Sequence, residues 1–214
     1  MLCEVMTDGD AHSGVVFVID DNASVRTALK ELFESVGLKT IPLKSPADFL
    51  GYKIPDTSCC IVVDVRMPEM TGLKLQEELA EAEIQVPVVF LTAHGSVDMA
   101  VAAMKAGAVD FLVKPFRTQD LLDAVFAALE HDHARRALQE SISTLQECFN
   151  ALSVREKEVL SHVAAGRLNK QIAAELGISE VMVKVHRAHG MRKMHAKSVA
   201  ELVRMTDLLN DAAA

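Results

Sequence analysis

The chain has 214 residues and a formal net charge of −8, and half of its residues are hydrophobic. This length allows one large domain or two small ones. No apolar run approaches the roughly 20 residues that a transmembrane helix requires, which argues against a membrane protein. Residues 1–14 lack a basic start followed by an apolar block. We therefore expect no signal peptide, a flexible lead-in over residues 1–14 and a cytoplasmic protein.

Charge is distributed unevenly along the chain. Residues 1–150 contain 12 Lys and Arg against 23 Asp and Glu, whereas residues 151–214 contain 10 against 7. An acidic part repels nucleic acid and a mildly basic part can bind it, so the pattern indicates two modules of different use. The four cysteines show no paired metal-ligand spacing, and we expect incidental or buried thiols.

Strand-like and helix-like segments alternate over the first 130 residues. Short apolar runs predict strands, and apolar residues at helical spacing predict the helices between them. The predicted strands cover residues 15–19, 38–41, 60–63, 87–91 and 109–113. The predicted helices cover about 22–35, 46–51, 72–82 and 96–106, and a further helix begins at 118. This alternation predicts an α/β fold, with a parallel sheet between two layers of helices.

Charged side chains follow three of the predicted strands. Asp20 and Asp21 follow the first, Asp64 the third and Lys114 the fifth. Because ligands of open α/β sheets bind beyond the carboxyl ends of the strands, these side chains predict one shared pocket. Taken singly, Asp20 and Asp21 could be helix-capping residues and Lys114 an ordinary surface lysine. An acid that ends a buried strand, as Asp64 does, is costly unless a cation or hydrogen-bond donors stabilise it.

The chain from residue 118 onward is predicted to be helical. No Gly or Pro interrupts residues 118–149, so one helix of roughly 30 residues is possible. We place the domain boundary near residues 131–148. His131 and His133 do not share a helix face, so we expect no metal site there.

Four short helices are predicted after this long one. They cover about 153–165, 170–176, 180–194 and 198–209. Ser153 and Glu156 form a capping-box pattern at the first of them, and Asn169 is expected to cap the second. The Gly-containing turn between the second and third matches helix-turn-helix geometry.

Several short motifs in residues 13–130 together resemble a response-regulator receiver domain. They are Asp20-Asp21, the turn Asp64-x-x-Met-Pro68 with Gly72, Thr92-Ala93, Ala106-Gly-Ala-x-Asp-Phe111 and Lys114-Pro115. Each motif is weak alone, but the full set in this order is specific. The resemblance implies a CheY-like (flavodoxin-like) fold with a five-stranded parallel sheet, and a cis peptide bond between Lys114 and Pro115.

The resemblance also implies a role for each pocket residue. Asp64 would accept a phosphoryl group from a sensor histidine kinase, and Lys114 and Thr92 would bind the phosphoryl oxygens. Mg²⁺ is the implied cofactor. Its implied ligands are Asp20, Asp21, Asp64 and the backbone carbonyl of Arg66. Thr92 and Phe111 would form the switch, in which Phe111 enters the space that Thr92 leaves, although by spacing alone Phe111 could be a core residue.

Residues 151–209 resemble the LuxR-type helix-turn-helix, and the order of the two modules resembles the FixJ/NarL class of transcription factors. The matching stretches are Leu152-Ser153-x-Arg155-Glu156-x-Glu158-Val159-Leu160, Asn169-Lys170-x-Ile172-Ala173, Leu176-Gly-Ile-Ser179, Val183-Lys184-x-His186-Arg187 and Lys193-Met194. Helix 180–194 would be the recognition helix in the major groove. The implied DNA-contacting residues are Asn169, Lys170, Val183, Lys184, His186 and Arg187, with His189 as a further candidate. Met182 stands where the family usually has Thr, which puts one phosphate contact in doubt.

The expected organisation is a lead-in over 1–14, a receiver domain over 15–130, a helical linker over 131–148 and a helix-turn-helix domain over 149–214. The expected function is that of a DNA-binding response regulator of a two-component system. Phosphorylation of Asp64 would promote dimerisation through the surface around residues 96–116 and promoter binding, and so regulate transcription, with activation as the expected direction. The implied partners are the kinase, promoter DNA, RNA polymerase and a second copy of the chain.

No enzymatic activity and no membrane partner are expected, but two alternatives stay open. The first is a phosphate-handling enzyme, against which the chain lacks an Asp-x-Asp pattern and a Gly-rich nucleotide loop. The second is a regulator of the same fold whose output is protein binding or DNA binding without phosphorylation.

Overall fold

The computed structural model describes residues 14–93 and 95–212. The chain divides into two compact units, with the division between Arg136 and Ala137. His94 and nearly all of the predicted lead-in lie outside the described residues. Within the described residues, no helix is long and apolar enough to cross a membrane.

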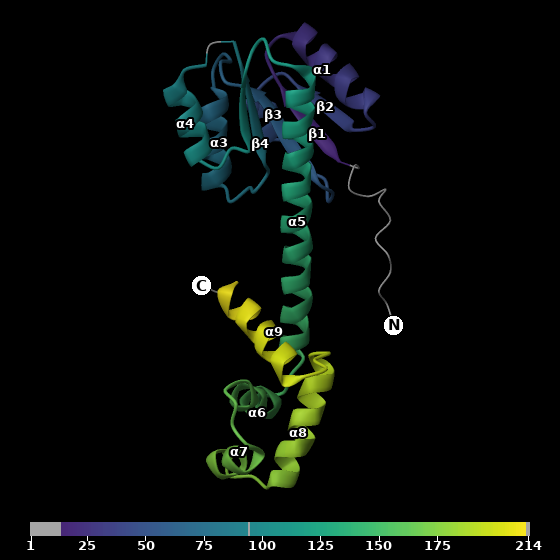
Figure 1. Ribbon diagram of the computed structural model, residues 1–214, viewed down its shortest axis with the longest axis vertical. Helices are drawn as coiled ribbons and strands as arrows, with labels where there is room; N and C mark the ends of the chain where they lie inside the picture. The colour runs from purple at the N-terminus through teal and green to yellow at the C-terminus, as the bar shows by residue number, and fades with distance from the viewer. Residues whose placement is uncertain (1–13, 94, 213–214) are drawn as a thin grey trace. The chain divides into compact units, whose positions relative to one another are not determined.

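Parallel strands form a five-stranded sheet in the first unit, in the order β2-β1-β3-β4-β5 (Figure 1). The strands are β1 (Val15–Ile19), β2 (Lys39–Leu43), β3 (Cys59–Asp64), β4 (Val88–Thr92) and β5 (Asp110–Val113). In this register Asp64 lies beside Leu91, and Thr92 lies beside Val113. The CheY-like α/β fold predicted from the sequence is confirmed, and the carboxyl ends of β1, β3, β4 and β5 share one edge of the sheet.

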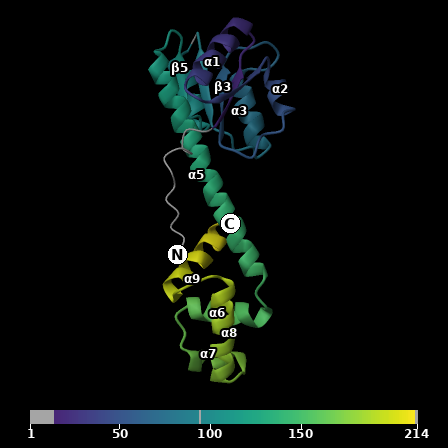
Figure 2. The same ribbon diagram turned by 90° about the vertical axis from the view of Figure 1, so that its right-hand side faces the viewer.

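Helices cover both faces of this sheet (Figure 2). They are α1 (Ala23–Ser35), α2 (Pro46–Leu50), α3 (Gly72–Glu81), α4 (Val97–Lys105) and α5 (Thr118–Asn150). Successive strand side chains point to opposite faces. Phe17 and Ile61 therefore pack in a core with residues of α2, α3 and α4, whereas Val18 and Val62 pack with residues of α1 and α5. Strands that are apolar on both faces are typical of a covered parallel sheet.

Local signals start several helices where the sequence predicts them. The Asn22 side chain accepts a hydrogen bond from the N–H of Ser24 at the start of α1, at 2.9 Å. Ser45 caps α2, and Pro46 occupies its first turn. One strand differs from the prediction, because β2 begins and ends later than residues 38–41 and contains Pro42. Proline is tolerated there since β2 is an edge strand.

The helix α5 runs without a break over 33 residues. At 1.5 Å per residue this corresponds to about 50 Å. Its buried residues extend from Leu121 to Asp132, all within the first unit. The segment 131–148, which was predicted to be a helical linker, is helical throughout.

Helices α6 (Val154–Ala164), α7 (Asn169–Leu176), α8 (Glu180–Lys193) and α9 (Val199–Asp211) follow in the second unit. The Ser153 Oγ accepts from the N–H of Glu156, and the Glu156 carboxylate accepts from the N–H of Ser153, which confirms the predicted capping box. Gly177 has a φ of 66° and ends α7 in the left-handed region, so the chain turns into α8. The helices enclose a separate core that includes Leu160, Ile172 and Val183.

The prediction that Asn169 caps α7 is wrong. Leu168 occupies the N-cap position, and Asn169 is the first residue of the helix. The Oδ1 atom of Asn169 instead accepts a hydrogen bond from Nη1 of Arg187 on α8, at 3.3 Å. The Asn169 side chain therefore links the two helices of the helix-turn-helix and does not cap α7.

Candidate functional site

Two carboxylates and an ammonium group meet at the carboxyl edge of the sheet. Asp20 follows β1, Asp64 is the last residue of β3, and Lys114 follows β5. The Nζ atom of Lys114 lies 2.9 Å from Oδ2 of Asp64 and 3.3 Å from Oδ2 of Asp20. The Asp20 and Asp64 side chains are only 3% and 14% exposed. The structure therefore brings together three of the residues that the strand ends predicted.

Backbone N–H groups hold the other oxygen of each carboxylate. Oδ1 of Asp20 accepts from the N–H of Asn22 at 2.8 Å, and Oδ1 of Asp64 accepts from the N–H of Arg66 at 2.9 Å. Both acids are thus oriented by the loop that follows their own strand and joined through Lys114. These hydrogen bonds offset the free energy that is lost when two carboxylates are removed from water at buried strand ends.

Lys114 is fixed by its backbone as well as by its side chain. Its N–H donates to the carbonyl of Thr92 at 2.7 Å, and its peptide bond with Pro115 is cis, as expected. Burial lowers the pKa of Lys114, but the contacts with Asp64 and Asp20 outweigh this effect and raise it above the ordinary value. The lysine is therefore charged throughout the physiological pH range.

The predicted metal ligands are only partly assembled. Asp21 is exposed, and among the described residues no group of three or more His, Cys, Asp and Glu side chains is placed to hold a metal ion. Asp20 and Asp64 nevertheless place carboxylate oxygens close together, both in contact with the Lys114 ammonium group. Mg²⁺ binds through oxygen ligands, commonly one or two carboxylates, and keeps several waters. The donor set present here fits that ion.

The two predicted switch residues are neighbours. The Thr92 side chain is fully buried, and the ring of Phe111 packs against that of Phe90 with 6.0 Å between the centroids. Gly95 lies between them: a Cβ built on it would stand 3.1 Å from both the Phe111 ring and the Thr92 methyl group. Sequence reasoning missed Gly95, because a close approach of this kind leaves no signal in one sequence.

The predicted DNA-contacting residues all lie on α7 and α8 of the second unit, and all but one are at least partly exposed. Lys170 and Lys184 are exposed, and Asn169 and His186 are partly buried. Arg187 is also partly buried and bonds Asn169. The exception is Val183.

The side chain of Val183 is 0% exposed and belongs to the core of the second unit, so it cannot contact DNA. We therefore remove Val183 from the predicted set. Its place in the motif is explained by packing between the helices, since Val183 lies in one core with Ile172 of α7.

Apolar side chains lie on the outer face of α8, and sequence reasoning had considered only Met182 among them. Val181, Met182 and Val185 are 68%, 44% and 39% exposed. Positions 181 and 185 are one helical turn apart, and Lys184 lies next to 185. Residues two positions away from a buried helical residue point away from the core, so the burial of Val183 explains the exposure of Val181 and Val185.

A parallel sheet with a Lys-bridged acid pair at its edge, followed by a helix-turn-helix, defines a regulator with one input and one DNA-binding module. Residues 16–126 match the family described as the response regulator receiver domain, and residues 150–206 match the luxR family of bacterial regulatory proteins. The chain therefore belongs to the response regulators of two-component systems, with a LuxR-type DNA-binding domain.

Named relatives agree with this assignment. The chain is 49% identical to nodulation protein W of Bradyrhizobium diazoefficiens over 93% of this chain and 88% of that protein. It is 40% identical to the transcriptional regulatory protein FixJ of Rhizobium meliloti, over 94% and 96%. The solved structure of the response regulator StyR is 44% identical and covers 91% of this chain and 98% of its own, with a TM-score of 0.83. The chain is thus similar to transcriptional regulators along nearly its whole length.

Proposed function

We propose that Asp64 is the phosphorylation site and that a sensor histidine kinase supplies the phosphoryl group. The observation that carries this proposal is the 2.9 Å contact between Asp64 and Lys114, beside the buried Asp20. In this contact Oδ2 of Asp64 is held against a fixed cation, which can neutralise the charge that arrives with a phosphoryl group. The group is accepted once per activation event and is not turned over on a substrate, so we propose no enzymatic role.

Asp20, Asp21, Asp64 and the backbone carbonyl of Arg66 would hold Mg²⁺. The bound ion would offset the negative charge on the equatorial phosphoryl oxygens. Asp21 is exposed and directly follows Asp20 in the chain, and its carboxylate would complete the set. Lys114 donates to the phosphoryl oxygens, and the Thr92 hydroxyl binds another of them.

The switch in this proposal is a movement of Thr92 and Phe111. When Thr92 moves toward the phosphorylated Asp64, the partly buried Phe111 turns inward into the vacated space. The change reaches α4 and β5, where Val97, Val101, Met104 and Val113 are 79%, 46%, 46% and 47% exposed. Such exposed apolar residues on neighbouring elements suit a pairing surface, and we propose that phosphorylated chains dimerise through it.

In the cytoplasm the dimer would bind promoter DNA through α8. Lys184, His186 and Arg187 are the proposed base- and phosphate-contacting residues of the recognition helix, and Lys170 and Asn169 support them from α7. A dimer would bind two half-sites about one helical turn apart. Contact with RNA polymerase would then change transcription, in the activating direction.

The test combines a phosphate donor with the substitution Asp64→Asn. Treatment of the parent chain with acetyl phosphate and Mg²⁺ is expected to add one phosphoryl group, measured by intact mass, and to produce dimers, measured by analytical ultracentrifugation. Footprinting of upstream DNA is expected to strengthen in the same sample. Asp64→Asn should abolish all three responses.

Asp123→Asn is the matched control, because Asp123 is an exposed residue on α5 that bonds Gln119 and lies outside the pocket. It should behave as the parent chain does. A response to acetyl phosphate that survives Asp64→Asn would show that the phosphorylation site is elsewhere.

A further inference from the structure

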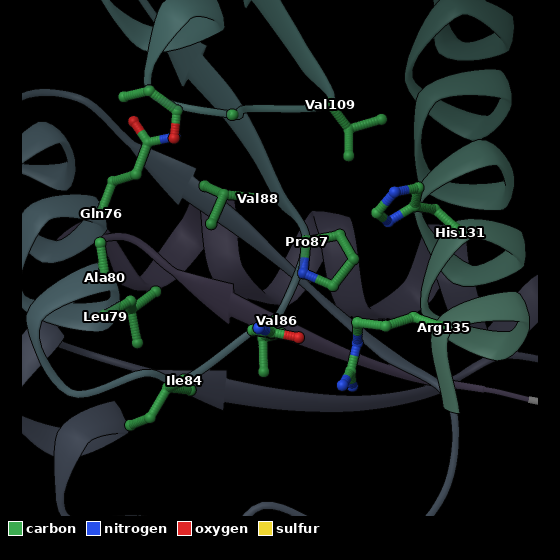
Figure 3. Close-up of a pocket in the computed structure, with 13 residues that line it drawn as sticks. Gln76, Leu79, Ala80, Ile84, Val86, Pro87, Val88, Val109, His131 and Arg135 are labelled. Carbon is green, nitrogen blue, oxygen red and sulfur yellow. The ribbon is translucent and has the colours of Figure 1, made fainter. Parts of the chain in front are cut away.

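A cavity of about 300 Å³ opens at the opposite edge of the sheet from Asp64, where β4 and β5 begin (Figure 3). It lies in the first unit and is formed by the ends of α3 and α4, the segment that leads into β4, and α5. Its volume is at the lower end of the range of about 300–1,000 Å³ in which small-molecule sites are found. No part of the phosphorylation pocket contributes to it.

Most of the cavity wall is apolar. Leu79 and Ala80 come from α3, and Ile84, Val86 and Pro87 come from the segment between α3 and β4. Val88 and Val109 continue the wall at the sheet. Gln76 also lines the cavity, but its Nε2 donates to the carbonyls of Ala103 and Ala106 and so closes the end of α4.

The α5 side of the cavity is polar. Figure 3 shows His131 and Arg135 projecting from α5 toward Pro87 and Val86. These positions are four residues apart, so they stand one turn apart on the same helix face. Among the described residues, no acidic side chain lines the cavity. A ligand here would therefore meet an apolar wall on one side and a cationic group on the other.

The guanidinium group of Arg135 is fixed in place by the buried carboxylate of Asp132. Its Nε and Nη2 donate to Oδ1 of Asp132 at 3.1 Å and 2.6 Å, and the Arg135 side chain is 28% exposed. Oδ2 of Asp132 accepts from Nε of Arg136 at 2.7 Å and from the N–H of Cys59 at 2.9 Å. Asp132 is thus shared between two guanidinium groups, and Nη1 of Arg136 also donates to Oδ1 of the exposed Asp56 at 3.3 Å, so among the described residues Arg135 relies on the shared Asp132 alone. The two hydrogen bonds from Arg135 to Asp132 use only part of the donor capacity of the Arg135 guanidinium group.

We propose that this cavity binds a small organic carboxylate with an apolar body, such as a medium-chain fatty acid. The apolar body would lie against Leu79, Ile84 and Val86, and the carboxylate would accept hydrogen bonds from Arg135, with His131 beside it. A guanidinium that is already fixed loses little conformational freedom on binding, which favours a carboxylate over a neutral head group. The ligand would contact α5 just before the division between the two units.

The experiment uses the full chain and compares octanoate with octanol, which have the same chain length but different head groups. Amide shifts in ¹H–¹⁵N spectra are followed during titration to millimolar concentration. Octanoate is expected to shift the amides of Val88, Gly107 and Val109, which line the cavity, and to leave those of Asp64 and Arg66 in place. Octanol is expected to bind about tenfold more weakly, since it lacks the charged hydrogen bond to Arg135.

Two variants locate the site. Ala80 is exposed and lines the cavity, so Ala80→Phe should fill it and abolish the octanoate shifts. Ala127→Phe places the same side chain at an exposed position of α5 outside the cavity and should leave binding unchanged. Thermal melts of both variants show whether the fold is kept. His131→Ala removes an exposed side chain that lines the cavity and should weaken octanoate binding.

Several outcomes would overturn the proposal. These are the absence of octanoate shifts at millimolar concentration, equal binding of octanol, or shifts that survive Ala80→Phe in a folded chain. Because none of these measurements involves phosphorylation, a failure here leaves the proposed role of Asp64 untouched, and the reverse also holds.

Discussion

Gly72 packs against the strand that ends in Asp64. A Cβ built on Gly72 would stand 2.5 Å from the carbonyl oxygen of Asp64 and 3.2 Å from the side chains of Phe90 and Val63. The N–H of Gly72 also donates to the carbonyl of Val65 at 3.0 Å. These neighbours are backbone and closely packed core atoms, and their displacement would cost free energy. Glycine is therefore required here by space, and the position of α3 beneath the pocket depends on it.

We predict that Gly72→Ala lowers the free energy of unfolding of the first unit by about 1–3 kcal/mol, the usual cost of overpacking. Gly51→Ala is the matched control, because a Cβ there would meet its nearest atom at 3.6 Å, an ordinary contact, and should change stability by less than about 0.5 kcal/mol. The measurement is urea denaturation followed by the fluorescence of Tyr52, the single tyrosine of the chain. Equal stability of the two variants would contradict the packing argument.

At the scale of the element, α8 carries two kinds of exposed side chain on its outer face. Lys184 is positively charged, whereas Val181, Met182 and Val185 are apolar and substantially exposed. In the major groove, apolar side chains contact the methyl group of thymine. If α8 is the recognition helix, these residues read thymine while the charged residues bind phosphates and guanine.

We predict that replacing the thymines of a bound half-site by uracil weakens binding, because uracil lacks that methyl group. Loss of one buried methyl contact corresponds to about a fourfold change in affinity. Val185→Ala should bind thymine and uracil sites almost equally. Val154→Ala makes the same substitution at an exposed position at the start of α6 and should keep the full thymine preference. Affinities are measured by fluorescence anisotropy at one fixed salt concentration. A thymine preference that Val185→Ala leaves intact would exclude this contact.

On the scale of the molecule, each of the two units contains a buried carboxylate that links two of its secondary-structure elements. In the first unit, burial would raise the pKa of Asp132, but hydrogen bonds from Arg135, Arg136 and the Cys59 N–H outweigh it and lower the pKa. These hydrogen bonds join α5 to the start of β3. In the second unit, Glu156 at the start of α6 accepts from Nζ of Lys193 at the end of α8, at 2.7 Å. That contact, together with the N–H of Ser153, lowers the pKa of Glu156 to about 2.

The lowered pKa of Glu156 makes the stability of the second unit depend on pH. The folded state favours the charged carboxylate, so its contribution is complete above the unfolded pKa of 4.5 and is lost as the pH falls toward about 2. Glu156→Gln should destabilise the unit at pH 7, and the difference from the parent chain should shrink between about pH 4.5 and 2.

Amide exchange of α6 and α8, measured by mass spectrometry, reports this stability for the second unit alone. Glu158→Gln is the control, since the Glu158 side chain is 39% exposed and pairs with Arg155 at the surface. It should change exchange little at any pH. A Glu156→Gln difference that stays constant from pH 7 to pH 3 would show that the carboxylate charge is not involved.

Much of the fold could be predicted because its signals are local. The apolar runs that became β1, β3 and β4 are buried on both faces, and caps such as Asn22 and Ser153 begin their helices by contacts within a few residues. The pocket of Asp20, Asp64 and Lys114 was also predictable. Parallel strands place their carboxyl ends at one edge, so residues that directly follow those strands must lie near one another.

Contacts between distant segments were not predictable from one sequence. The family resemblance implied that Val183 contacts DNA, but it is buried, and Asn169 bonds Arg187 instead of capping α7. Asp132 falls within the segment 131–148 that was predicted to be a linker, yet it is fully buried and accepts a hydrogen bond from the N–H of Cys59 at the start of β3. The cavity beside Arg135 likewise has no sequence signature.

The sequence by itself determined the order of the strands and helices and the residues that stand at their ends, because hydrophobic periodicity and capping act over a few neighbouring positions. Only the tertiary structure decided which of the charged and apolar helical residues face a core, a partner side chain or solvent. That choice depends on which helix faces pack together, as at α7 and α8 and at α5 and β3. The free energy of such contacts comes from residues far apart in the chain, so no short stretch encodes it.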